Sequence, residues 1–251
     1  MLIAPGVEAL DLEMDLFAAP SWVHPTLLWD EADAVLIDAG YYGQLPRLQA
    51  EMERVGVPLD RLTRLIVTHQ DIDHIGGIAP LLEVSGPVEV LASEAERPYV
   101  VGEKRIVKIP PERVALLSER LSHLPEEERE QTIEAFTNPR PRVDRTVSDG
   151  ERLPYCGGIV AVYTPGHTPG HMSLYLESSK VLVAGDALNL VEGRLVGPNQ
   201  QLTPDLGQAT ASLKRLAPYD IETVVCYHGG VYSGEANARI AELAVGPVTG
   251  S

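Results

Sequence analysis

Short apolar runs alternate with polar turns along most of the chain. Thr26–Trp29 and Ala34–Ile37 are two such runs joined by the polar segment 30–33, and this arrangement predicts a β-hairpin. In residues 44–55 the apolar side chains recur at near-helical spacing instead. This stretch therefore predicts an amphipathic helix that follows the hairpin.

The same patterns continue to the end of the sequence. The glycine pair Gly76-Gly77 opens a further predicted helix, and two more helices are expected at 205–216 and 235–244. Apolar runs bounded by turn residues predict strands at 65–67, 88–91, 159–163, 173–176, 181–183 and 223–226. No internal repeat is evident, so we expect strands and helices of one continuous architecture.

Residues 94–149 differ from this pattern. They contain an acidic run at 126–130, and apolar residues at helical spacing at Val114, Leu117 and Leu121. Few large apolar side chains are available here for a separate core. The sequence therefore predicts one domain over residues 1–251, with a helical insertion at about 94–149 that packs over the main body.

The charge of the chain narrows the classes of partner. With 20 Lys and Arg against 36 Asp and Glu among 251 residues, the formal net charge is −16. An acidic surface repels the phosphates of nucleic acids and anionic membranes, so neither is expected as a partner. We expect a small-molecule substrate, and the sequence leaves a homodimer open.

The cysteines and the N-terminus indicate the compartment. Cys156 and Cys226 lie far apart in the sequence and outside any CxxC pattern, which favours free thiols in a reducing environment. The first 20 residues lack the basic start and apolar run of a signal peptide. No apolar stretch reaches the roughly 20 residues that span a bilayer. A cytoplasmic location is expected.

The strongest chemical signal is a cluster of polar residues that follows the predicted strand at 65–67. The segment His69-x-Asp71-x-Asp73-His74 places four candidate metal ligands in one loop, directly before glycines. Imidazole and carboxylate groups suit zinc, iron or manganese. A solvated polar turn is the alternative.

Three further candidate ligands stand directly after predicted strands. His167 lies in Thr164-Pro165-Gly166-His167-Thr168-Pro169-Gly170-His171, Asp186 lies in Ala184-Gly185-Asp186-Ala187, and His228 follows the strand at 223–226. The same context, a strand followed by a candidate ligand, recurs four times, which favours a common metal site. Asp186, a carboxylate beside a Gly at a strand end, is well placed to bridge two cations.

With these motifs the sequence resembles the metallo-β-lactamase superfamily, whose signature is HxHxDH followed by a distant His, an Asp and a last His. The resemblance runs from the hairpin to His228 and implies an α+β fold, an αββα sandwich with the metals at one edge. It also implies the ligand roles. His69 and His167 would bind the first of two metal ions, Asp73, His74 and His228 the second, and Asp186 would bridge them.

The sequence departs from this signature at Asp71, which stands where the family has a second His. We expect Asp71 to bind the first metal, and the alternative is that it caps the following helix. More oxygen ligands favour harder cations. Zinc is the favoured metal, with manganese or iron as alternatives.

Four residues are expected around the metals. His171 is interpreted as a donor behind the ligands or a substrate contact, and Asp38 as a buried carboxylate that steadies the metal loop or a simple turn residue. His24 could line the cleft, although a satisfied loop histidine is the favoured interpretation. Asn189 stands three residues after Asp186, where similar lactonases carry a Tyr, so lactonase activity of that type is not the first expectation.

The predicted function is a dinuclear metal-dependent hydrolase that activates a bridging water to cleave a small ester, thioester or lactone. Asp73 is expected to orient the water or to protonate the leaving group. Only 23 residues follow His228, which disfavours a glyoxalase II with its helical substrate domain. The alternatives are a metal-dependent oxidoreductase using iron, sulfur or oxygen chemistry, a phosphodiesterase, and a non-catalytic metal-binding module.

Overall fold

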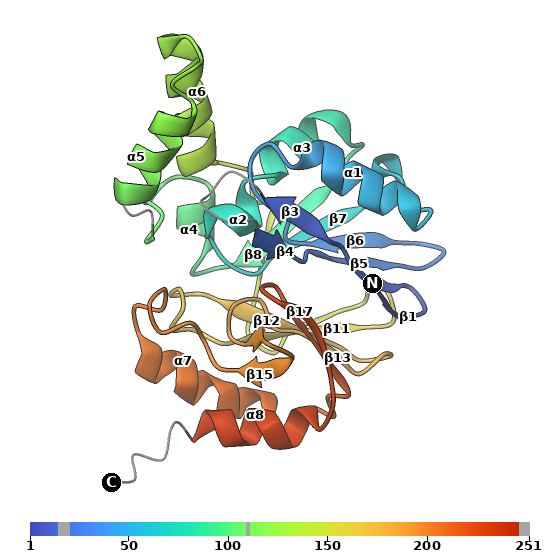
Figure 1. The fold of residues 1–251 in the computed structure, drawn as a ribbon. Coiled ribbons are helices and arrows are strands. Elements are labelled where there is room, and N and C mark those ends of the chain that lie inside the picture. The colour runs from blue at the N-terminus through green and yellow to red at the C-terminus, as the bar shows by residue number, and fades with distance from the viewer. Residues whose placement is uncertain (15–20, 109–110, 246–251) are drawn as a thin grey trace, which may run out of the picture.

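The structure is a computed structural model that describes residues 1–14, 21–108 and 111–245. Its architecture is an αββα sandwich (Figure 1). Among these residues, two large β-sheets pack face to face, and helices cover the outer face of each sheet. The fold class predicted from the sequence is confirmed.

The first sheet has the strand order β1-β2-β5-β6-β7-β8-β9. The predicted hairpin is confirmed as β5 and β6, which pair antiparallel, and β6 to β9 pair in parallel. Its strands are β1 (Leu2–Ala4), β2 (Val7–Ala9), β5 (Thr26–Trp29), β6 (Ala34–Ile37), β7 (Arg64–Val67), β8 (Glu89–Ser93) and β9 (Arg145–Val147).

The second sheet has the order β10-β11-β12-β13-β16-β17, and β13 and β16 are parallel neighbours. Its strands are β10 (Arg152–Leu153), β11 (Ile159–Tyr163), β12 (Met172–Leu176), β13 (Val181–Val183), β16 (Thr223–Cys226) and β17 (Gly230–Ser233). Two short hairpins accompany the sheets: β3 (Leu12–Met14) with β4 (Ser21–Val23), and β14 (Asn189–Val191) with β15 (Arg194–Val196).

Helices α1 (Leu45–Arg54) and α3 (Ile78–Val84) lie on the outer face of the first sheet, and α7 (Leu206–Ser212) and α8 (Ala236–Ala244) cover the second (Figure 1). The short helix α2 (Ile72–Ile75) precedes α3. Single 3-10 turns, η1 (Leu59–Arg61) and η2 (Leu213–Leu216), extend the connections. The predicted helices at 44–55, 205–216 and 235–244 are confirmed to within a residue or a terminal 3-10 turn.

Alternation along the strands explains the layers. In β7, Leu65 and Val67 pack toward α1 and α3, whereas Ile66 points into the interface between the sheets. Because successive side chains of a strand point to opposite faces, β7 contributes both to the core under the helices and to the core between the sheets. On the other sheet, Leu182 packs toward the second helix layer. Burying one such side chain contributes about 1.5–3 kcal/mol, so the paired sheets hold the strand ends firmly in place.

The insertion differs from its expected range of 94–149. Its helices are α4 (Arg97–Val100), α5 (Pro111–Arg120) and α6 (Glu126–Thr137), and α5 and α6 project from one corner of the molecule (Figure 1). Residues 145–147 form β9 and pair with β8, so the helical part ends before them. The sequence pattern did not predict this edge strand, because the run Arg145–Val147 is too short and too polar to be distinguished from a loop.

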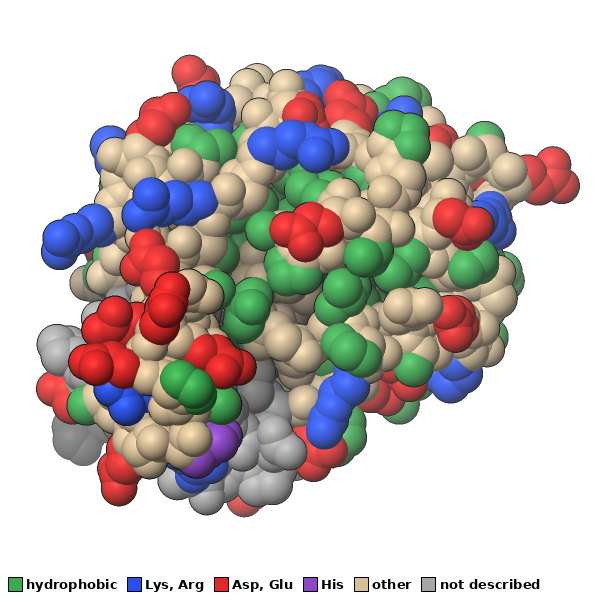
Figure 2. Space-filling model, turned by 90° about the horizontal axis from the view of Figure 1, so that it is seen from above, with side chains coloured by type: hydrophobic (Ala, Val, Ile, Leu, Met, Phe, Trp, Pro, Cys, Tyr) green, Lys and Arg blue, Asp and Glu red, His purple; other side chains and the backbone are tan. Residues whose placement is uncertain are grey.

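The surface is strongly mixed in charge. Acidic side chains gather on the projecting helices, and Lys and Arg side chains are scattered among other groups on the face seen from above (Figure 2). The first turn of α6 carries Glu126, Glu127 and Glu128. None of the helices in the described ranges has both the length and the apolar character needed to cross a membrane.

Candidate metal centre

The candidate ligands lie at one edge of the sandwich, where several strands end. The loop of residues 68–74 follows β7, residues 164–171 follow β11, Asp186 lies just after β13, and His228 follows β16. Backbone hydrogen bonds fasten these loops across the two sheets: Met172 N–H donates to Thr68 O at 3.1 Å. The carboxyl ends of parallel strands thus bring residues that are distant in sequence to one place.

The first group of ligand atoms comes from His69, Asp71, His167 and Asp186. The His167 Nε2 atom lies 3.1 Å from Asp71 Oδ2 and 3.1 Å from Asp186 Oδ2. The His69 Nε2 atom lies 3.4 Å from Asp71 Oδ2. Imidazole nitrogens and carboxylate oxygens therefore face one another around a single point.

The second group comes from Asp73, His74 and His228. The His228 Nε2 atom lies 3.2 Å from Asp73 Oδ2, and the His74 Nε2 atom lies 3.8 Å from the same oxygen. Asp186 connects the groups, because its Oδ1 atom lies 3.4 Å from His74 Nε2 while its Oδ2 atom faces His167. Its carboxylate stands between the two groups, as a bridging ligand must.

Asp71 does not cap the helix that follows it. It occupies the N-cap position of α2, but its side chain makes no capping hydrogen bond and points to His69 and His167 instead. The capping alternative from the sequence is therefore wrong. The carboxylate that replaces the usual His lies among the ligand atoms of the first group.

Orphaned buried atoms test whether cations fit here. Within the described part of the chain, His69 Nε2, His74 Nε2, Asp71 Oδ1 and Asp186 Oδ1 are buried without a hydrogen-bond partner. Leaving such atoms unpaired costs about 1–3 kcal/mol each, so a fold does not retain four of them without a ligand. In its deprotonated form, each of these atoms offers a lone pair of the kind that divalent metals bind. The residues fit a pair of metal ions.

A buried carboxylate behind the candidate ligands helps to position the loop of residues 68–74. Asp38, directly after β6, is 1% exposed and accepts hydrogen bonds from Thr68 N–H at 2.8 Å and from the Thr68 hydroxyl at 2.7 Å. Its Oδ2 atom also lies 2.7 Å from His74 Nδ1. Asp38 thereby fixes which ring nitrogen of His74 faces the centre.

His171 lies behind the ligands. Its Nδ1 atom is 2.9 Å from the Thr164 hydroxyl, and its Nε2 atom accepts the backbone N–H of Asp186 at 3.0 Å. Complete burial, assisted by the nearby charge of His167, lowers the pKa of His171 to about 3. A neutral His171 is the form that can accept the Asp186 N–H, so its ring helps to position Asp186 through the backbone.

Two residues that support the site were not anticipated. Tyr227 stacks on the His74 ring with centroids 3.7 Å apart, and its hydroxyl donates to the Asp73 carbonyl at 2.5 Å and accepts from Gly40 N–H at 3.2 Å. The sequence offered a weak signal, because Tyr227 stands beside His228 at a strand end.

Glu96 is the second such residue. This buried carboxylate accepts the backbone N–H and the side-chain amide of Gln70, both at 3.0 Å, and the backbone N–H of Gly170 at 2.6 Å. Burial raises the pKa of Glu96, and the amide donors oppose that effect. One side chain thus joins the loop of His69 to the loop of His167. Like the candidate ligands, Glu96 follows a strand, β8. The sequence pattern assigned it to the predicted insertion at 94–149 and therefore did not place it at the site.

Replacing Glu96 by Gln is expected to lower the free energy of unfolding by about 1–3 kcal/mol, because an amide group would face buried N–H donors. Urea denaturation of metal-free protein measures this change. Glu94→Gln is the matched control, since Glu94 is exposed on the same turn and should change little. Equal stability of the two variants would show that Glu96 does not tie the loops.

Four of the candidate ligands, Asp71, Asp73, Asp186 and His228, line a cleft with a volume of about 390 Å³. The cleft also contains Lys108, from the segment between α4 and α5, which no sequence motif singled out. The cleft is lined by Tyr41, Asp71, Ile72, Asp73, Val107, Lys108, Asp186, Gln201, Leu202, Thr203, Pro204 and His228.

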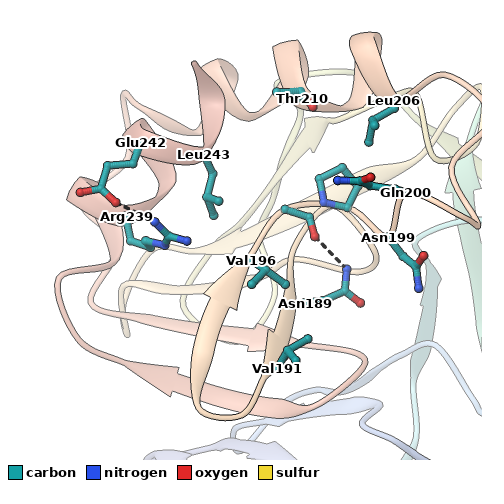
Figure 3. Close-up of a pocket in the computed structure, with 12 residues that line it drawn as sticks. Asn189, Val191, Val196, Asn199, Gln200, Leu206, Thr210, Arg239, Glu242 and Leu243 are labelled. Carbon is teal, nitrogen blue, oxygen red and sulfur yellow. Dashed lines mark hydrogen bonds and ion pairs between the residues drawn. The ribbon is translucent and has the colours of Figure 1, made fainter. Parts of the chain in front are cut away.

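His24 and Asn189 lie outside the lining of this cleft. The His24 ring pairs with Asp11, with Nδ1 and Oδ1 2.9 Å apart, and burial lowers its pKa. Asn189 lines a second cavity of about 580 Å³ between the β14–β15 hairpin and α8, and its amide donates to Gly197 O at 3.3 Å (Figure 3). The segment 197–204 lies between the two, because residues 197–200 line this cavity and residues 201–204 line the cleft beside the candidate ligands.

The carboxylates dominate the charge of the centre. Although burial lowers the pKa of His228, Asp186 and Asp73 raise it to about 10. In the same way burial lowers the pKa of His74, but Asp38, Asp73 and Asp186 raise it well above its ordinary value. Without cations, the excess negative charge therefore favours the protonated forms of His74 and His228.

Metal binding at neutral pH is consequently expected to release protons. His228, with a pKa of about 10, must lose a proton before its ring nitrogen can bind a metal ion, so affinity should rise as pH increases toward that value. Calorimetric titrations with zinc in two buffers of different ionisation enthalpy measure the release, which should be about one proton per chain or more. Identical heats in both buffers would contradict it.

Comparisons with known proteins agree with this geometry. The sequence matches the metallo-beta-lactamase superfamily over residues 23–228, a range that includes every candidate ligand. The chain belongs to this superfamily. Its member in Bacillus subtilis (strain 168) named probable metallo-hydrolase YflN is 31% identical over 227 residues, covering 84% of this chain and 81% of that protein.

Two further proteins are similar over most of the chain. A hydroxyacylglutathione hydrolase of Ruegeria pomeroyi is 29% identical over 87% of this chain, which spans only 64% of that relative. A metallo-beta-lactamase family protein from Thermus thermophilus superposes with a TM-score of 0.70 at 28% identity, covering 97% of this chain and 80% of that one. These similarities support a metal-dependent hydrolase of the superfamily.

Proposed function

We propose that the protein is a dinuclear metal-dependent hydrolase that cleaves a small ester, thioester or lactone. The observation that carries this proposal is the pair of adjoining groups of candidate ligands, with Asp186 facing both and lining the cleft. Two divalent cations, when bound, would supply Lewis acidity and lower the pKa of a water molecule toward neutrality. Zinc is the metal we propose, with manganese and iron as alternatives.

The side chains divide the work around the cations. His69, Asp71 and His167 would hold one cation, and Asp73, His74 and His228 the other. Asp73 has 11% of its side chain exposed and lines the cleft, so its carboxylate can reach both water and substrate. We assign it to orienting the attacking water or to protonating the leaving group.

The residues that line the cleft favour a small substrate with an apolar part. Tyr41, Ile72 and Leu202 line it together with the ionisable groups. A volume of about 390 Å³ suits an acyl group or a lactone ring. The similarity to a hydroxyacylglutathione hydrolase favours thioesters among the candidates.

A substrate panel tests the proposal. Protein reconstituted with zinc or manganese is assayed on acyl thioesters, aryl esters, lactones and a phosphodiester, and we expect turnover of at least one carboxylic substrate that is lost on chelation. Cleavage of the phosphodiester alone would replace the proposal with a phosphodiesterase. Oxygen consumption on a persulfide by the iron-loaded protein, with no hydrolysis, would replace it with an oxidoreductase.

A further inference from the structure

The Lys108 ammonium lies inside the first ligand group. Its Nζ atom is 2.6 Å from Asp71 Oδ2 and 2.5 Å from His167 Nε2. Only 13% of the side chain is exposed, although the residue belongs to the segment that leads into the projecting helices. The two atoms that Lys108 contacts, Asp71 Oδ2 and His167 Nε2, are the ones that would bind the first cation.

The backbone next to Lys108 is fastened to the metal loop. The Val107 N–H donates to the side-chain carbonyl of Gln70 at 2.8 Å, and Gln70 lies between His69 and Asp71 in sequence. Gln70 is itself held by the buried Glu96 carboxylate through two donors. The backbone that carries Lys108 is therefore fastened to the loop of His69 and Asp71, which keeps the side chain within reach of the first ligand group.

An ammonium group and a metal ion exclude each other at this point. Lys108 offers three N–H donors and no lone pair, so it can neutralise Asp71 but cannot bind a cation. Two positive charges within a few ångströms repel strongly in a buried site. In the described part of the chain, Lys108 makes no ion pair or hydrogen bond with Asp73, His74 or His228. Lys108 therefore competes with a cation only at the group of His69, Asp71 and His167.

We propose that Lys108 is a tethered competitor for the first metal ion. The group of Asp73, His74 and His228 fills first, and the group of His69, Asp71 and His167 binds its cation only when the Lys108 side chain withdraws from Asp71. The two halves of the centre thus differ in affinity, and the metal supply sets whether one or two cations are held. This inference rests on the dinuclear centre of the proposed function but makes a claim about binding alone.

Zinc titration of the metal-free, full-length protein tests the inference by calorimetry. The wild type should show one tight and one weak binding event. Lys108→Met removes the ammonium, and the weaker dissociation constant should then fall by about 10- to 100-fold, the worth of one or two charge-assisted hydrogen bonds. The tighter constant should stay within about threefold, as expected for a charge that does not contact that group.

Three further variants complete the test. Lys108→Gln should tighten the weak event as Lys108→Met does. Lys104→Met removes a charge from the same segment, where Lys104 lies over the Tyr99 ring, and should change neither constant. His167→Ala should abolish the weak event and keep the tight one, which assigns the events to the two groups.

Unchanged dissociation constants in both Lys108 variants would overturn the inference, as would two equal events in the wild type. The readout is independent of hydrolysis. Protein that binds zinc as expected but turns over no substrate in the panel would remove the proposed function and leave the role of Lys108 standing.

Discussion

Asp186→Asn is expected to lower kcat/KM by about 1,000-fold, or ~4 kcal/mol of transition-state stabilisation, on whichever substrate the panel identifies. The substitution keeps the shape of the side chain but removes the charge that faces both ligand groups, 3.1 Å from His167 Nε2 and 3.4 Å from His74 Nε2. Steady-state kinetics and metal analysis of the same preparation measure the effect, and both cations should bind more weakly.

Asp220→Asn is the matched control for Asp186. Asp220 has 73% of its side chain exposed and pairs with Lys180 far from the cleft, so this variant should keep wild-type kinetics and metal content. If Asp186→Asn retained more than about a tenth of the activity with both metals bound, the carboxylate would not bridge the groups.

Asp38→Ala is expected to lower the free energy of unfolding of the metal-free protein by about 3–5 kcal/mol. The change leaves Thr68 N–H, the Thr68 hydroxyl and His74 Nδ1 without their shared acceptor in a fully buried place. Urea denaturation without metal measures this loss, because bound metal would add its own stabilisation.

Asp38→Asn separates the effect of losing the carboxylate charge from the effect of backbone strain at this position. Asp38 has a φ of 59°, a left-handed conformation that Asn tolerates and Ala does not. We expect Asn to cost about 2–3 kcal/mol and Ala to cost about 1–2 kcal/mol more. Stabilities of both variants within about 0.5 kcal/mol of the wild type would show that Asp38 is only a turn residue.

The sequence predicted that these candidate ligands gather at one place, because its signal is local. Each ligand follows an apolar run, and strand ends gather at one edge once the strands form sheets. Four separate loops with imidazole or carboxylate groups are hard to explain otherwise. The hairpin of β5 and β6 and the strands β11, β13 and β16 were predictable for the same reason, since their apolar runs have clear ends.

The parts that were missed depend on contacts between segments far apart in the sequence. The strands β1 to β4 and β9 are each three residues long, and they become strands only through their neighbours in the sheets. Glu96 and Lys108 carry no motif, and their roles follow from burial and from partners in other loops. Asn189 was expected near the substrate from its distance to Asp186 in sequence, but β14 carries it into the second cavity.

A crystal structure of the zinc-loaded protein, with anomalous diffraction recorded at the zinc edge, tests the central claim most directly. We predict two anomalous peaks about 3.5–4 Å apart, one beside His69 and His167 and one beside His74 and His228, with Asp186 between them. An active protein whose zinc lies elsewhere, or whose anomalous map is empty at these side chains, would contradict the account.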